Sequence, residues 1–218
     1  MGRRSKRRGA AGAPPLPHGP GARARTEVAR VAARLMAEEG VHDFSEAKAK
    51  AAAQLGVHGR HALPRNDEIE AELRSYQALF QAEEHGRWLA EKRRTALAAM
   101  ALLERFRPRL AGAVLRGTAA EDAEITLHLF VDPPEAVATF LYDRGIPWEP
   151  DAWVGRFGGG REIEFPMYRI TPGGESVRLI VFPAEGSREA PRSPVDGRPM
   201  ARAGRAEVEE LLAEEPET

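Results

Sequence analysis

The feature that most constrains the fold is a run of strictly alternating residues at positions 124–131. Every second residue of the run is apolar, and the residues between them are Glu124, Thr126, His128 and Phe130. A period of two indicates a β-strand, because successive side chains of a strand point to opposite faces of a sheet. The run therefore predicts a strand with one buried apolar face and a second face that carries Glu124, Thr126 and His128.

Two glycines, Gly112 and Gly117, bracket a short segment ahead of this strand. Glycine lets a backbone approach a ligand closely and point its N–H groups at an anion. Arg116 adds positive charge to the segment and Thr118 adds a hydroxyl. The segment predicts a phosphate-binding turn made of Gly112, Ala113, Arg116, Gly117 and Thr118. The simpler alternative is a strand that is entered through a glycine turn and has no ligand.

Residues 112–130, GAVLRGTAAEDAEITLHLF, resemble the motif of the minimal nucleotidyltransferases, small bacterial proteins of the polymerase β-like superfamily. That motif reads GSxxRG, six further residues, and DxDL. Aligned without a gap, four positions agree with it: Gly112, Arg116, Gly117 and Leu127. Similarity of other runs to bacterial proteins of this kind, including SPVDGRPM at residues 193–200, extends the resemblance over about residues 26–213.

The departures from the motif fall on the residues that would bind a metal. The two aspartates of the motif correspond to Glu124 and Thr126, and its two serines to Ala113 and Ala123. In the family, two carboxylates on one strand face hold the Mg²⁺ ions that orient a nucleotide's phosphates. A hydroxyl cannot replace the missing negative charge. The resemblance therefore implies a nucleotidyltransferase-like protein that binds a nucleotide or a nucleic-acid phosphate and is catalytically degenerate.

An active enzyme is the first alternative. It would need further acids beside Glu124 as the catalytic carboxylate, and Glu162 and Glu164 supply a pair at i and i+2 of a later predicted strand. With His128 they would form a weak Mg²⁺ site. In the family the third carboxylate usually comes from a later strand, whereas the run VRLIVF at residues 177–182 carries Arg178 and no acid.

The rest of the chain predicts an α+β fold, with a helical N-terminal region at residues 26–107 and a mixed sheet flanked by helices at residues 108–213. Apolar spacing and capping residues predict four helices in the first region, at about residues 26–40, 45–55, 67–80 and 87–106. The second region adds a helix after the first strand, two strands, and a final helix, at about residues 133–145, 162–170, 175–182 and 206–212. Trp148 and Trp153 fall in a segment that reads as a loop.

A nucleic-acid-binding or regulatory protein is the second alternative. Residues 1–25 are rich in basic residues, glycine and proline and have no acid, which predicts a disordered tail able to contact RNA or DNA. The first two predicted helices, with Lys48 and Lys50 on the second, are compatible with a helix-turn-helix. Residues 214–218 form a short acidic tail.

Composition excludes several classes of protein. The chain has no cysteine, which rules out disulfides, thiolate catalysis and cysteine-ligated zinc. It also has no apolar run long enough to cross a membrane, and its basic N-terminus lacks the apolar core of a signal peptide. We therefore expect a cytoplasmic protein with no membrane partner.

Overall fold

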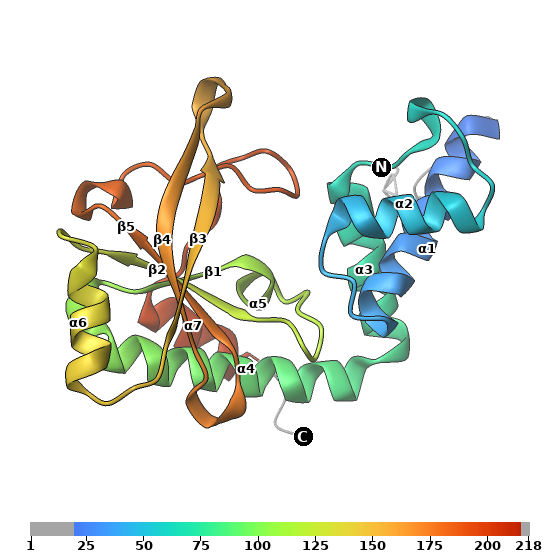
Figure 1. Cartoon of the computed structure of the whole chain (residues 1–218). Coiled ribbons are helices and arrows are strands. Elements are labelled where there is room, and N and C mark those ends of the chain that lie inside the picture. The colour runs from blue at the N-terminus through green and yellow to red at the C-terminus, as the bar shows by residue number, and fades with distance from the viewer. Residues whose placement is uncertain (1–19, 215–218) are drawn as a thin grey trace, which may run out of the picture.

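The computed structural model describes residues 20–214. Within that range the chain forms seven α-helices and one five-stranded mixed sheet (Figure 1), which confirms the predicted α+β class. Residues 1–19 of the predicted basic tail and residues 215–218 of the predicted acidic tail lie outside the described part. None of the described helices combines the length and the apolar character that crossing a lipid bilayer requires.

The first three helices form a bundle that we call the helical unit. They are α1 (Pro20–Glu38), α2 (Phe44–Gln54) and α3 (Asn66–Phe80). Their buried side chains, among them Leu35 and Ile69, make a core of their own. In Figure 1 the unit, coloured blue to teal, stands to one side of the sheet.

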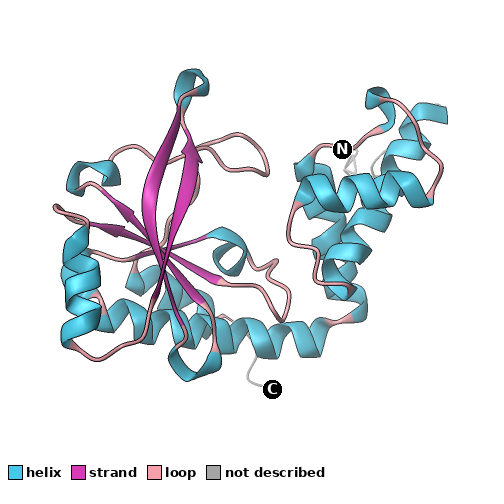
Figure 2. Cartoon of the chain, viewed as in Figure 1, coloured by secondary structure: helices cyan, strands magenta, loops and turns pink. Residues whose placement is uncertain are grey.

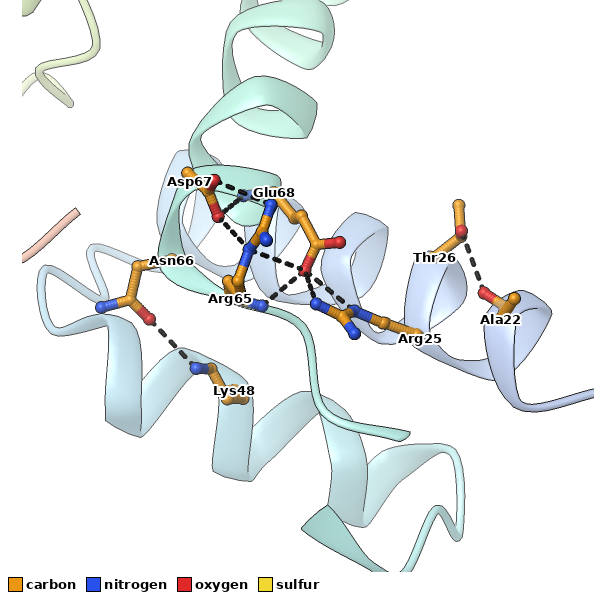
Figure 3. A network of polar contacts seen from close by, with 8 residues as sticks. All are labelled: Ala22, Arg25, Thr26, Lys48, Arg65, Asn66, Asp67 and Glu68. Carbon is orange, nitrogen blue, oxygen red and sulfur yellow. Dashed lines mark hydrogen bonds and ion pairs between the residues drawn. The ribbon is translucent and has the colours of Figure 1, made fainter. Parts of the chain in front are cut away.

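Helix α1 begins at Pro20, six residues before the start that the sequence predicts. Proline is tolerated at the first position of a helix because its missing N–H would have no partner there. Arg25 lies within α1 and forms an ion pair of 2.7 Å with Glu68 of α3 (Figure 3). Residues 20–25, which composition places in a disordered tail, are therefore helical, and Arg25 contacts α3.

Helix α4 (Ala82–Leu102) follows α3 after one residue, Gln81, whose backbone angles are not helical (φ −131°, ψ 17°). Sequence spacing groups α4 with the helices before it. In the structure it runs along the sheet (Figure 1), and Leu89, Ala96 and Met100 belong to the core of the sheet. The chain thus divides near Gln81 into the helical unit and residues 82–213, which we call the sheet unit.

The sheet has the strand order β1-β2-β5-β4-β3. Its strands are β1 (Arg109–Ala111), β2 (Ile125–Phe130), β3 (Glu149–Arg156), β4 (Glu162–Ile170) and β5 (Val177–Phe182). Strands β2 and β5 are parallel, and the other neighbours are antiparallel. Three more helices belong to this unit: α5 (Gly112–Arg116), α6 (Glu135–Asp143) and α7 (Arg205–Ala213).

Strand β3 occupies a segment that the sequence predicts to be a loop. It contains Pro150 and has mostly exposed side chains, so it lacks the alternation that marks a half-buried strand. Residues 149–156 nevertheless pair along their whole length with β4. The two strands form a hairpin that projects beyond the rest of the sheet (Figure 2).

Strand β2 is buried on both faces, although its sequence predicts one buried face. Leu127 and its apolar neighbours pack into the core that α4 covers. On the opposite face, Phe130 packs with aromatic residues of β4 and β5. Arg202, from the segment after β5, lies over the rings of Phe130 and Phe182, with its guanidinium carbon 5.0 and 4.8 Å from the two ring centres. This later segment and the aromatic residues of β4 and β5 together bury the second face.

Candidate functional site

A polar cluster lies on the sheet face opposite α4, at the N-terminal end of β2. Thr126, Arg178 and Arg169 occupy matching positions of β2, β5 and β4, with Thr126 beside Arg178 and Arg178 beside Arg169. Side chains at matching positions of paired strands project from the same face. With Glu124 and Ser176, just before β2 and β5, these residues form what we call the Glu124 cluster.

Glu124 is the centre of this cluster. Its Oε1 accepts hydrogen bonds from Arg169 Nε at 2.6 Å and from Ser176 Oγ at 2.7 Å, and Arg178 Nε lies 3.2 Å from its Oε2. Burial opposes ionisation of Glu124, but the bonds from Ser176 and Arg169 and the charge of Arg178 outweigh it and hold its pKa below the usual value. Glu124 is therefore an ionised carboxylate held between two guanidinium groups.

The cluster does not fit a Mg²⁺ ion. Magnesium in proteins is held by carboxylate oxygens and water in a nearly octahedral arrangement. Here the second acidic position is Thr126, whose Oγ1 accepts a hydrogen bond of 2.9 Å from Arg178. Two arginine side chains stand where a cation would bind. Across residues 20–214, no group of three or more histidine, aspartate or glutamate side chains is arranged to hold a metal.

The predicted phosphate-binding turn forms the short helix α5 and the glycine that ends it. Gly112 and Gly117 both have positive φ angles, 77° and 72°, which favour glycine. Gly112 lies against the Glu124 cluster, since a Cβ atom added there would be 3.5 Å from Thr126 Oγ1. Ala113, the next residue, is partly buried.

Arg116 and Thr118, the other predicted phosphate ligands, contact the helical unit. Arg116 Nε donates a hydrogen bond of 2.6 Å to Glu70 Oε1 of α3, and Thr118 Oγ1 lies 3.5 Å from the same oxygen. The predicted turn therefore has two ends with different neighbours. Gly112 adjoins the sheet cluster, and Arg116 adjoins the carboxylate of Glu70.

The structure does not bring His128 to Glu124. His128 lies on β2, four residues after Glu124, and in extended chain this separates their Cα atoms by about 13 Å. His128 is fully buried, and its Nδ1 accepts a hydrogen bond of 2.9 Å from Arg202 Nε. Burial, reinforced by the charges of Arg202 and Arg178, lowers the pKa of His128 to about 3. His128 is therefore a neutral core residue.

Glu162 and Glu164 are not brought to Glu124 either. They lie seven and five residues before Arg169 on β4, respectively, so the pleat directs them to the opposite sheet face from Arg169. Even the nearer one, Glu164, is about 17 Å along the strand from Arg169. Glu162 forms an exposed ion pair with Arg156 across the β3–β4 hairpin, at 2.8 Å.

The sequence gives little sign of two residues that complete the cluster. Arg169 and Ser176 precede and follow the turn between β4 and β5, and nothing in their local pattern distinguishes them from exposed polar residues. Arg178, a cation within an apolar strand, is the visible signal. Comparisons of the chain with protein-family models, curated proteins and solved structures find no match, so the function has to be inferred from the geometry of the site.

Proposed function

We propose that the protein is nucleotidyltransferase-like and binds the phosphate of a nucleotide or a nucleic acid without transferring a nucleotidyl group. The observation that carries the proposal is the pair of guanidinium groups, from Arg169 and Arg178, around Glu124. They stand where the resemblance to nucleotidyltransferases places the metal-binding acids. A site with guanidinium groups at this position is suited to bind an anionic ligand directly, without a metal ion.

The chemistry of the cluster supports phosphate as that anion. Arginine presents a rigid fork of N–H donors that matches the oxygens of a phosphate. The side chains of Arg169 and Arg178 are 32% and 34% exposed, so a ligand can reach them. Arg169 Nη2 also lies 3.5 Å from Asp151, an exposed carboxylate at the edge of the cluster that an incoming phosphate would displace.

Helix α5 extends the proposed site toward a third arginine, Arg116. Gly112, at its start, adjoins the Glu124 cluster, and Arg116 is at its end. Four residues of α-helix span about 6 Å, so a triphosphate or two successive phosphates of a nucleic acid can reach both points. This arrangement keeps Arg116 and Gly117, which match the motif, and Thr118, which supplies a hydroxyl, as ligand residues.

Two observations favour binding over nucleotidyl transfer. Metal-dependent transfer needs carboxylate oxygens that coordinate the metal ion. The Oε1 of Glu124 instead accepts hydrogen bonds from Arg169 and Ser176. The acids proposed to assist it, Glu162 and Glu164, are on the other sheet face. Mg²⁺ is therefore not part of the proposed site.

The helix-turn-helix alternative receives less support. Lys48 of α2 donates a hydrogen bond of 3.0 Å to Asn66, and Lys50 pairs with Glu46 at 2.9 Å (Figure 3 shows the first contact). Both lysines are thus engaged within the helical unit. Nucleic acid remains in the proposal as one of two sources of the phosphate.

Calorimetric titration with each of the four nucleoside triphosphates, and with a short single-stranded oligonucleotide, tests the proposal. We expect at least one of these ligands to bind with the same affinity in Mg²⁺ and in a chelator, because arginine side chains make the contacts. The two kinds of ligand distinguish a nucleotide from a nucleic-acid phosphate. Binding that requires Mg²⁺ would contradict the proposal and favour the active enzyme.

A further inference from the structure

We propose that Glu70 of α3 competes with the ligand phosphate for Arg116 and Thr118. We call its contact with these two residues the latch, because it holds the helical unit against residues 112–118. This inference rests on the proposed function, because it concerns the regulation of the same site. Glu70 contacts Arg116 and Thr118, two of the proposed ligand residues. A phosphate can bind them once Glu70 has left.

The contacts of Glu70 resemble those of a bound anion. Its side chain is 11% exposed, and its Oε1 accepts the hydrogen bond of 2.6 Å from Arg116. Arg74 of the same helix approaches its Oε2 at 3.6 Å. A carboxylate and a phosphate present similar acceptor oxygens to an arginine fork. Glu70 therefore occupies the position at Arg116 that a ligand phosphate requires.

Polar contacts join the helical unit to the sheet unit beside this latch. His42 Nε2 lies 3.2 Å from Asp122 Oδ2, and Asn66 Nδ2 donates a hydrogen bond of 2.7 Å to the carbonyl oxygen of Pro194. Each unit has its own apolar core. Units that meet through polar contacts move relative to one another more readily than units that share a core.

The junction between α3 and α4 favours such a motion. Gln81 interrupts the helix, and Gln77, Gln81 and His85 follow one another at helical spacing along the junction. Both amide atoms of Gln77 and Oε1 of Gln81 are buried and have no hydrogen-bond partner among residues 20–214. Buried polar groups without partners destabilise the closed arrangement, and opening would let water hydrate them.

The latch follows from these observations. In the closed form Glu70 satisfies Arg116 and Thr118, and the unpaired groups at the junction offset part of that stabilisation. An anionic ligand competes with Glu70 and binds the open form more tightly, so it shifts the population toward that form. Removing the negative charge of Glu70 should have the same effect without a ligand.

The test combines a distance measurement with a titration. The chain has no cysteine, so Gln54→Cys on α2 and Asp143→Cys on α6 can carry a pair of spin labels at exposed positions. In Glu70→Gln we expect a longer and broader distance distribution and about tenfold tighter binding of the triphosphate or oligonucleotide that binds the wild type. Glu72→Gln is the matched control, because Glu72 also lies on α3 but pairs with Arg30 of α1 at 3.6 Å.

Asp122→Asn is a second variant, at an exposed contact whose loss does not disturb a core. It should lengthen the distances in the same direction, by a smaller amount. Unchanged distances in both variants would overturn the latch. Longer distances with unchanged affinity would overturn the competition between Glu70 and the ligand. If the distances lengthen but no phosphate ligand binds any variant, the latch stands and the proposed function fails.

Discussion

Replacing Arg178 with glutamine should weaken binding of the ligand phosphate about thirtyfold, equivalent to about 2 kcal/mol. Arg178 donates to Thr126 and lies beside Glu124, and Thr126 in turn adjoins Gly112 of the predicted turn. Glutamine keeps most of the length of the side chain but has neither the charge nor the fork. Calorimetric titration of the variant with the ligand that binds the wild type measures the change.

Two further variants show whether the guanidinium itself matters. Arg178→Lys keeps the charge and should recover part of the affinity, because lysine cannot make the paired contacts of arginine. Arg156→Gln removes an arginine that is 78% exposed on the projecting hairpin, and should bind as the wild type does. Equal affinity in Arg178→Gln and the wild type would place the phosphate elsewhere.

Acid should destabilise the protein through His128 between pH 6.5 and about 3. The pKa of His128 falls from its ordinary 6.5 to about 3 in the folded protein, because the ring is buried and lies near Arg202 and Arg178. Between these values the unfolded chain binds a proton that the folded protein does not. The contribution of His128 to the free energy of unfolding is therefore fully present above pH 6.5. As the pH falls below 6.5, the free energy of unfolding decreases by roughly 1.4 kcal/mol per pH unit, which amounts to several kcal/mol across the window.

His128→Asn isolates this contribution. The asparagine Oδ1 can accept the hydrogen bond from Arg202 in place of the histidine Nδ1, and it does not titrate. The lowered pKa of Glu124 adds acid sensitivity to both proteins, so the difference between them reports on His128. Denaturant unfolding at pH values from 4 to 8 should show a shallower loss of stability in the variant. Identical pH dependence in the two proteins would contradict a buried neutral histidine.

Much of the fold can be predicted from local sequence patterns. Strand β2 follows from strict alternation, and α2, α3 and β4 follow from apolar spacing bounded by caps, glycine and proline. Strand β3 cannot be predicted in this way, because pairing with β4 rather than burial makes it a strand. The burial of the second face of β2 depends on Arg202 and its neighbours, more than seventy residues later in the chain.

The candidate site is only partly visible in the sequence. Alternation correctly places Glu124 and Thr126 together on one face, and the motif indicates that an acid is missing there. It does not show that Arg169 donates a hydrogen bond to the remaining acid or that Arg178 forms an ion pair with it, because the register between β2, β5 and β4 is a tertiary property. The partner of Arg116 was equally beyond local patterns, since Glu70 belongs to a helix in another unit.

The central claim is that arginine side chains, and not a metal ion, bind the phosphate in this protein. A crystal structure of the protein grown with the triphosphate or oligonucleotide that it binds and with Mn²⁺ would test this most directly, because Mn²⁺ replaces Mg²⁺ and is located by its anomalous scattering. We predict phosphate oxygens within hydrogen-bond distance of Arg169 and Arg178 and no Mn²⁺ on Glu124. A Mn²⁺ ion coordinated by Glu124, with the arginines turned away, would contradict the claim.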